Sequence, residues 1–271
     1  MTELYCSTTI NYAHPEFDVA PRSVDIHNAR GIDWLHWEEN GFELIDHVSA
    51  VADWADEDSL EQTYHAEMEA LARSLTECDH ALIGSHICRN PETARQHQDY
   101  APIQYAHSDF TETYGDLLRH RFGSSDPGAE RALERAGIDA RVVESAERLL
   151  VLQFWRNVGA PKMDLPLAFC DAQTVPRSEL LSINVPNYAD SGEPFDAFGL
   201  LSSDEQEHQW YVFPEMRSDE VIAFRTYDSA CVDLDQPFWT PHCAFPDPHH
   251  APGSGLPARY SIEVRATCLF T

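Results

Sequence analysis

The stretch "RYSIEVRATCLF" (residues 259–270) is the most informative strand signal in the sequence. Two sets of side chains alternate along it: Arg259, Ser261, Glu263 and Arg265 in one set, and Tyr260, Ile262, Val264 and Ala266 in the other. Because successive side chains of a strand point to opposite faces, the polar set shares one face. A guanidinium and a hydroxyl on one face suit the binding of a carboxylate through charge-assisted hydrogen bonds.

Further β-favouring segments precede this one and are separated by Pro, Gly, Asp and Ser clusters. They are "LVLQFWRNV", "LPLAFCD", "ELLSINVP", "HQWYVFP", "EVIAFRTYD" and "FWTPHCAF". Such a series of short strands is typical of a barrel or a sandwich. We therefore expect residues 151–271 to hold most of the core of a mainly β fold with flanking helices.

The rest of the chain is expected to flank this core within a single domain of residues 1–271. Residues 1–60 indicate short strands. Residues 59–78 indicate an amphipathic scaffold helix that Ser59 and Gln62 would cap. "HALIGSHIC" and "APIQYAH" indicate two more strands. Residues 115–150 indicate a helical insertion, with Asp126-Pro127 as a helix start and Gly137 as a divider.

The chain is strongly acidic, with 46 acidic against 18 basic residues and a formal net charge of -28. This charge would repel nucleic acids and anionic membrane surfaces, so we expect neither as a partner. Lys162 is the one lysine among the basic residues. A solvated acidic surface and adaptation to a saline habitat explain this balance equally well.

The cysteines indicate a reducing compartment. The seven residues are odd in number and never spaced as CxxC, which argues against a disulfide framework or a zinc ribbon. The N-terminal residues have no pattern of a secretory signal, and no apolar run approaches the roughly 20 residues of a membrane span. We therefore expect a cytoplasmic protein. Its association with copies of itself stays open.

The segment "YAHSDFT" (residues 105–111) contains a candidate half of a metal site. His107 and Asp109 lie two residues apart at the end of a β-favouring run, so their side chains would share a face. A mononuclear iron(II) oxygenase uses two imidazoles and one carboxylate on one face of the ion. The pair alone is weak evidence, because a turn in which Asp109 caps its own backbone would have the same sequence.

A third ligand is available at His208 or at His242. In 2-oxoglutarate-dependent oxygenases of the double-stranded β-helix fold, the distal histidine precedes a last strand with an arginine, often as RxS. His242 precedes Arg259-Tyr260-Ser261, and this order favours His242. The intervals before and after His242 are long for these enzymes, so Arg265 remains a second candidate for the arginine that binds the co-substrate.

The chain resembles the iron(II)/2-oxoglutarate-type oxidoreductases grouped around the cephalosporin 7α-methoxylation protein, the endoperoxide-forming enzyme of novofumigatonin biosynthesis, the AsaB-like hydroxylase/desaturases and the gibberellin desaturase. The stretches that carry the likeness, in order, are "GFELIDH", "HSDFT", "WRNVGAPKMDLPLAFCD", "HQWYVFPEMRSDEVIAFRTYDS", "TPHCAFPDP" and "RYSIEVRA". The resemblance implies a double-stranded β-helix (jelly-roll, cupin-like) core.

The resemblance also implies iron(II), 2-oxoglutarate and O2, and oxidation of a small molecule of secondary metabolism. It supports His107, Asp109 and His242 as metal ligands, and an arginine of "RYSIEVR", with Ser261, at the co-substrate. Hydroxylation, desaturation and cyclisation all occur among such enzymes, so the reaction outcome does not transfer.

Four further residues are candidates for substrate contact: Arg156, His208, Trp210 and Arg225. For both arginines a buried ion pair is at least as good an interpretation, and for Trp210 we expect packing. Two other functions stay open: a cupin-like metal-dependent hydrolase or isomerase, and a non-catalytic β-sandwich that binds a small ligand. The Pro/Gly-rich residues 246–258 are expected to form a loop or a lid.

Overall fold

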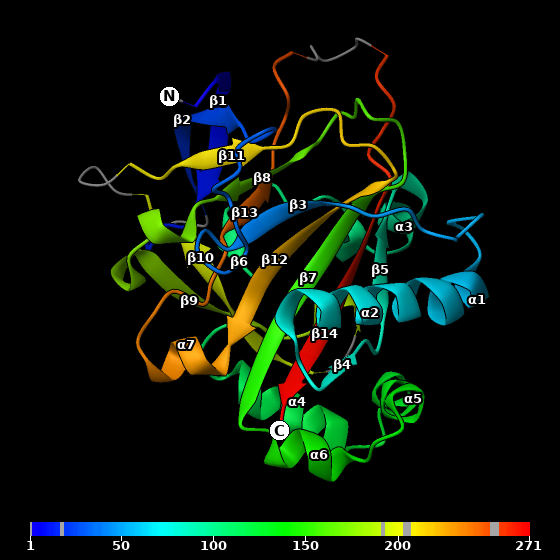
Figure 1. The fold of residues 1–271 in the computed structure, drawn as a ribbon. Coiled ribbons are helices and arrows are strands. Elements are labelled where there is room, and N and C mark those ends of the chain that lie inside the picture. Colours follow the sequence, from blue (N-terminus) through cyan, green and yellow to red (C-terminus); the bar gives the residue numbers. More distant parts are fainter. Residues whose placement is uncertain (1, 17–18, 191–192, 203–206, 250–254) are drawn as a thin grey trace.

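The computed structural model describes residues 2–16, 19–190, 193–202, 207–249 and 255–271, and in this part of the chain two β-sheets form the core (Figure 1). The first sheet has eight strands, in the order β1 (Leu4–Tyr12), β2 (Ala20–Asn28), β11 (Trp210–Val212), β8 (Leu167–Cys170), β13 (His242–Ala244), β6 (His107–Ser108), β10 (Phe195–Leu200) and β9 (Leu180–Val185). All neighbours are antiparallel except β2 and β11.

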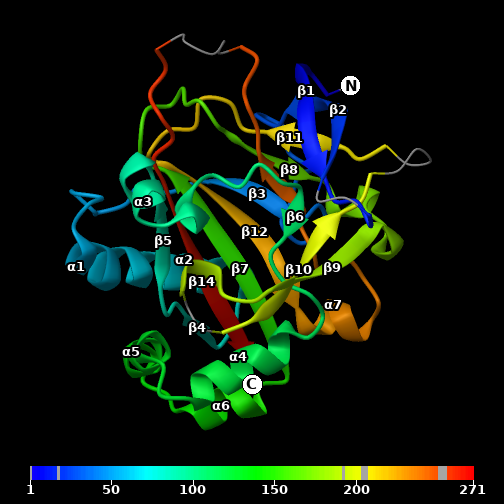
Figure 2. The ribbon, with the colours of Figure 1, turned by 180° about the vertical axis from the view of Figure 1, so that it is seen from behind.

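The second sheet contains six strands among the described residues. Its order is β3 (Phe42–Asp46), β12 (Glu220–Asp228), β7 (Arg148–Asn157), β14 (Ser261–Phe270) and β4 (His80–Leu82), and β5 (His86–Arg89) also pairs with β14. β7 and β14 pair along their whole length, from Ser261 opposite Asn157 to Phe270 opposite Arg148. The two sheets together form the double-stranded β-helix core that the sequence predicted. Figure 2, seen from behind, shows β6, β9 and β10 of the first sheet.

The alternation expected for residues 259–270 is confirmed in β14. Ile262, Val264 and Ala266 belong to an apolar cluster that also includes residues of a long helix on the outer face. Glu263 and Arg265 point the other way, into the interior, where they line a cavity. β7 does the same, with Leu150, Leu152 and Phe154 in the outer cluster and Gln153 at the cavity. The pair β7 and β14 therefore contacts the outer helix with one face and forms part of the cavity wall with the other.

The scaffold helix runs over α1 (Glu57–Ser59), a π-helical turn η1 (Leu60–Tyr64) and α2 (His65–Thr76), and it lies across the six-stranded sheet (Figure 1). Leu60, Tyr64 and Met68 are its buried contacts. The predicted capping box at Ser59 is wrong. The helix begins after Asp56, so Ser59 already has helical φ/ψ and its side chain makes no capping hydrogen bond.

Three helices cover one end of the core: α4 (Tyr114–Gly123), α5 (Pro127–Ala136) and α6 (Ala140–Ser145). Asp126 caps α5 by accepting a hydrogen bond from the backbone N–H of Ala129, as predicted. Gly137 ends α5 in the left-handed region, with φ of 68°.

The remaining helical elements are short. They are α3 (Pro91–Gln96), α7 (Ser229–Asp233) and 3-10 turns at Gln98–Tyr100, Ala172–Thr174, Arg177–Glu179 and Tyr188–Asp190.

Three strand predictions differ from the structure. "HALIGSHIC", expected as one strand, forms the two strands β4 and β5, with residues 83–85 between them. "APIQYAH" is irregular except for His107, which begins the two-residue strand β6. The strand β10 was not predicted, because "FDAFGL" lacks a β-branched residue and is stabilised by pairing with the preceding strand β9 and with the distant strand β6.

Two other expectations concern the chain as a whole. All seven cysteines are free, and most are buried. Among the described residues no helix has the length and apolar character needed to cross a bilayer. Within the expected loop or lid of residues 246–258, positions 250–254 lie outside the described residues.

A buried ion pair fastens β7 to β12 far from the cavity, and it provides a test of the fold. Arg148 donates to both carboxylate oxygens of Asp228, at 2.9 and 2.6 Å. Asp228 is completely buried, so Arg148→Met would leave its charge without an ion-pair partner. In the described chain only hydrogen bonds from Ala230 and Cys231 would then hold it. Because Arg148 itself is partly exposed, we expect a loss of about 2–4 kcal/mol in the free energy of unfolding. Urea denaturation would measure this loss, and an unchanged midpoint would contradict the prediction.

Candidate metal centre and its cavity

Three donor residues meet where two neighbouring strands of the eight-stranded sheet lie side by side. His107 in β6 is the direct register partner of His242 in β13, and Asp109 comes just after β6. The Nε2 atoms of both histidines lie 3.6 Å from the Oδ1 atom of Asp109. The imidazole centroids are 4.4 Å apart. The structure therefore brings together the three residues that the sequence predicted as metal ligands.

Backbone carbonyls fix the tautomer of both histidines. The Nδ1 of His107 lies 2.7 Å from the carbonyl oxygen of Tyr105, and the Nδ1 of His242 lies 3.0 Å from that of Thr240. A carbonyl only accepts, so each Nδ1 carries the proton and donates it. Nε2 of each ring is then the atom available to bind a metal, and both Nε2 atoms belong to the converging donor group.

The electrostatics of the site keep its donors in the metal-binding state. Burial raises the pKa of Asp109, but the Arg265 guanidinium and the two imidazoles outweigh it and hold the pKa well below its usual range. Burial, with the neighbouring His242, lowers the pKa of His107 to about 4. At neutral pH the site therefore offers the carboxylate of Asp109 and the unprotonated imidazole of His107.

Two imidazole nitrogens and one carboxylate oxygen form the donor set of mononuclear iron(II) oxygenases. Among the described residues, this is the one group of three or more His, Cys, Asp or Glu side chains whose donor atoms converge, all within 4.8 Å of one another. Iron(II) therefore fits the residues present.

A cavity of about 640 Å³ opens from these donors. Most of its wall is apolar or aromatic, and includes Leu118, Phe122, Ile183, Val185, Phe195 and Phe198. Phe110 and Tyr114 stack with their ring centroids 3.4 Å apart. Its charged lining residues include Arg89, Arg259, Glu263 and Arg265. The volume suits a drug-sized organic molecule.

The two candidate arginines of the last strand occupy different positions. Arg265 donates two hydrogen bonds to Oδ2 of Asp109, at 2.9 and 3.2 Å. Arg259 is 4 % exposed, and in the described chain its guanidinium donates to Ser261 Oγ at 3.0 Å and to the carbonyl of Leu165 at 3.3 Å. Neither partner is a carboxylate. Burial and the nearby Arg89 lower the pKa of Arg259 to about 9, so this cation would gain much from an anionic ligand.

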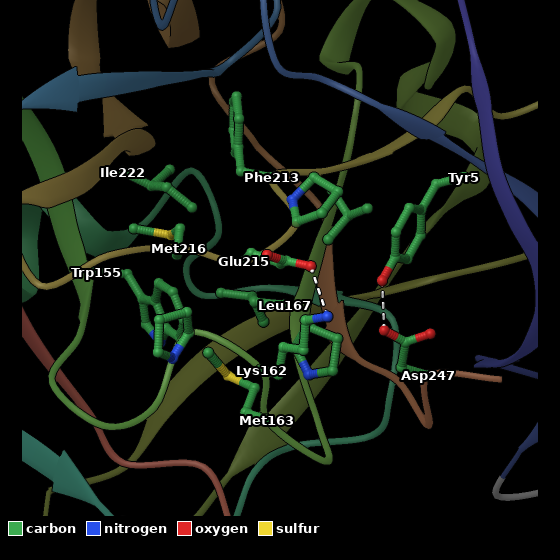
Figure 3. Close-up of a pocket in the computed structure, with 14 residues that line it drawn as sticks. Tyr5, Trp155, Lys162, Met163, Leu167, Phe213, Glu215, Met216, Ile222 and Asp247 are labelled. Carbon is green, nitrogen blue, oxygen red and sulfur yellow. Dashed lines mark hydrogen bonds and ion pairs between the residues drawn. The ribbon is translucent and has the colours of Figure 1, made fainter. Parts of the chain in front are cut away.

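A second hollow, drawn in Figure 3, lies between Trp155, Lys162, Met163 and Met216. Its volume of about 20 Å³ holds about one water molecule. Lys162 and Glu215 form an ion pair across its edge at 3.0 Å, and Tyr5 donates to Asp247 at 2.5 Å. The hollow is too small for a substrate.

The predicted substrate contacts of Arg156 and Arg225 are corrected by the structure. Arg156 is fully buried but lies away from the cavity lining, where it donates to the carbonyls of His47 and Ser218. Arg225 donates to the carbonyls of Glu38 and Pro237. Both guanidiniums therefore fasten loops to the barrel, and neither forms the Arg–Asp pair considered for it.

His208 and Trp210 are also away from the cavity lining. The Nε2 of His208 lies 2.7 Å from a carboxylate oxygen of Glu179, and its Nδ1 lies 3.3 Å from the hydroxyl of Tyr12. Trp210 is fully buried and donates to the same hydroxyl. These residues pack β11 against β1, which agrees with the packing role expected for Trp210.

The sequence reasoning missed Gln153, Arg89 and the inward role of Glu263. All three line the cavity. Gln153 is 1 % exposed, and within the described chain its Oε1 has no hydrogen-bond partner. The one signal that could have found Gln153 is a glutamine in the middle of the otherwise apolar run "LLVLQFW".

The donors and the jelly-roll cavity define a class, the double-stranded β-helix metal enzymes with a centre of two histidines and one carboxylate. The chain belongs to the family described as "Oxidoreductase/YMDC permease-like domain", which matches residues 3–269.

Two relatives from fungi are similar over most of their length. The "Alpha-ketoglutarate-dependent dioxygenase phiK" of Fungal sp. is 26% identical, over 96% of this chain and 88% of the relative. The "Fe(II)/2-oxoglutarate-dependent dioxygenase nvfI" of Aspergillus novofumigatus is 28% identical, over 92% and 84%. The solved structure of the "iron and alpha-ketoglutarate-dependent endoperoxidase NvfI with different conformation" superposes with a TM-score of 0.78 at 24% identity, and the match covers 99% of both chains. The superposition confirms the predicted fold. The two relatives carry the name of the class that the sequence predicted, the iron(II)/2-oxoglutarate-dependent oxygenases.

The pKa of His107 predicts how the stability of the metal-free protein depends on pH. His107 has a pKa of about 4 when folded, against 6.5 for the ordinary group. As the pH falls from 6.5 to 4, the unfolded chain binds a proton that the folded chain does not, so stability falls with pH. Between pH 6.5 and pH 4, we expect the free energy of unfolding to fall by about 3 kcal/mol less in His107→Gln than in the native protein.

Urea denaturation in the presence of a chelator, at several values between pH 4 and 7, would measure the effect. His36→Gln changes a histidine whose side chain is 52% exposed and serves as the control. If the His107→Gln curve runs parallel to that of the native protein, the prediction is wrong.

Proposed function

We propose that this protein is an iron(II)- and 2-oxoglutarate-dependent oxygenase in which His107, Asp109 and His242 bind the metal and Arg259 binds the distal carboxylate of 2-oxoglutarate. The observation that carries the proposal is the convergence of three buried donor atoms on one cavity that also contains a buried arginine without a carboxylate partner in the described chain. Its substrate is a small organic molecule that is apolar over much of its surface.

Iron(II) with 2-oxoglutarate and O2 would supply an oxidant for unactivated C–H bonds, with succinate and carbon dioxide as co-products. The protein's own part is to orient the metal ligands and to exclude water from the reacting centre. Tyr105 and Thr240 orient the two imidazoles through their carbonyls. The apolar cavity wall excludes water from the oxidising centre, which protects the side chains around it.

Arg259 suits the role of a carboxylate clamp because it is already held in place. Ser261 accepts a hydrogen bond from its Nε, and its guanidinium lies over the Trp155 ring at 5.2 Å from the centroid. Both contacts reduce the side-chain entropy that binding would otherwise cost. Glu263 and Asp164 are near enough to act on its charge, but in the described chain no carboxylate is hydrogen-bonded to the guanidinium, and that of 2-oxoglutarate would supply this contact.

The aromatic part of the cavity wall supports an apolar substrate. Phe110, Tyr114 and Phe195 form one aromatic group on its wall. The Oε1 of Gln153, which has no hydrogen-bond partner among the described residues, can accept a hydrogen bond from a hydroxyl or N–H group of a bound molecule. Whether the outcome is hydroxylation, desaturation or cyclisation depends on where this wall places the reacting carbon.

The metal assignment predicts a spectroscopic signature. Anaerobic addition of iron(II) and 2-oxoglutarate should produce a weak metal-to-ligand absorption band, and His107→Ala and His242→Ala should abolish it because each removes one imidazole ligand. His208→Ala changes an equally buried histidine outside the cavity and should keep the band. Absence of the band from the native protein, together with tight retention of zinc, would contradict the oxygenase assignment.

The clamp assignment predicts a selective loss of 2-oxoglutarate binding. Arg259→Met removes charge-assisted hydrogen bonds of about 1.5–3 kcal/mol, so the Kd for 2-oxoglutarate should rise about 10–100-fold. Titration of the absorption band at saturating iron would measure it. Arg225→Met, at a buried arginine outside the cavity, should leave this Kd unchanged. Unaltered 2-oxoglutarate binding by Arg259→Met would show that another group holds the carboxylate.

A further inference from the structure

We propose that Arg265 is a positioning residue that holds Asp109 so that one carboxylate oxygen binds the metal, and that Glu263 and Arg89 hold Arg265 in place. The inference rests on the proposed function, because it concerns the same metal centre. It assigns Arg265 a role distinct from the co-substrate binding for which the sequence made it a candidate.

The two oxygens of Asp109 have different surroundings. Oδ2 accepts hydrogen bonds from both Nε and Nη2 of Arg265, at 3.2 and 2.9 Å. Oδ1 faces the two histidines, with an Nε2 atom of each at 3.6 Å. Two charge-assisted bonds to one oxygen reserve it for Arg265 and fix the rotation of the carboxylate. The other oxygen is thereby presented alone to the metal.

One-oxygen binding matters because the ion has a limited number of positions. Two imidazoles and one carboxylate oxygen take one face of an octahedral ion and leave the opposite face open. A second oxygen of Asp109 would take one of the open positions, which 2-oxoglutarate and O2 need. Arg265 therefore protects the open face without contacting the metal.

Arg265 is itself fixed by a buried line of alternating charges. Its Nη2 lies 3.7 Å from Glu263, and Glu263 accepts hydrogen bonds from Arg89 at 3.0 and 3.2 Å. Arg89 also donates to the carbonyls of Asp99 and Ala101, at 2.6 and 2.9 Å. Each charge in this line has an opposite neighbour, so burial leaves none of them unpaired.

The same line reaches the cavity wall. Arg89 donates to the hydroxyl of Tyr188 at 2.8 Å, and Tyr188 lines the cavity. The Arg265 guanidinium lies over the ring of Phe110, the residue after Asp109, with 5.6 Å between its Cζ atom and the ring centroid. Arg265 thus fixes both the ligand and the start of the aromatic wall.

The test uses Co(II) as the probe metal, because its visible absorption reports both affinity and coordination number and needs no 2-oxoglutarate. Arg265→Met should weaken Co(II) binding about 10–100-fold and change the intensity of the absorption bands. Arg265→Lys, which keeps one charged donor, should recover part of the affinity. Glu263→Gln should weaken binding less than Arg265→Met, because the guanidinium remains.

Arg148→Met is the matched control, since it breaks a buried Arg–Asp pair on β7 away from the cavity lining. It should lower the free energy of unfolding but leave the Co(II) spectrum unchanged. Native Co(II) affinity and spectrum in Arg265→Met would overturn the inference. Native Co(II) behaviour combined with weakened 2-oxoglutarate binding would overturn it in favour of Arg265 as the co-substrate clamp.

The proposed function and this inference can fail separately. If the native protein gives no iron/2-oxoglutarate band while Arg265→Met still weakens Co(II) binding, the oxygenase assignment fails and the positioning role stands. If Arg265→Met does not fold, the Co(II) affinities of Arg265→Lys and Glu263→Gln are compared with that of the native protein instead. Native Co(II) affinity in both of these variants would then overturn the inference.

Discussion

The two-residue side-chain period of the paired strands β7 and β14 is the constraint on which the rest of the structure depends. Their outer face is apolar and packs under the scaffold helix, with Leu152, Phe154 and Val264 among its contacts. Their inner face carries Gln153, Glu263 and Arg265 into the cavity. A shift of the register by one residue would exchange the two faces and would bury charge under the helix.

Burial of charge is the second organising problem of this molecule. Asp109, Glu263, Arg89 and Arg259 are all nearly inaccessible to solvent. Burial of an unpaired charge is strongly unfavourable, and in this protein it is offset by ion pairs that connect the donor cluster to the surrounding strands. Arg259 is the exception, because in the described chain its guanidinium is not hydrogen-bonded to a carboxylate. It is therefore the arginine that we assign to an anionic ligand.

Local signals in the sequence predicted local features well. Asp126 and Pro127 indicated the start of α5, and the alternation of residues 259–270 indicated the faces of β14. Predictions failed where the pattern of one segment does not decide the result. The helix begins after Asp56 rather than at Ser59, and strand β10 exists because β6 and β9 pair with it. Arg156 and Arg225 are buried in loop contacts that their own strands do not reveal.

The sequence by itself determined the kinds of donor and the face of the last strand that carries charge. The spacing of His107 and Asp109 and the alternation along β14 are local properties, so the chain specifies them directly. Only the tertiary structure decided which arginine meets which carboxylate. Arg259 and Arg265 share one face of the same segment, and the position of β6 across the barrel brings Asp109 to Arg265. Arg259 therefore remains available for a ligand. The sequence could not show this, because the alternation along one strand does not encode which residues of the other sheet lie opposite it.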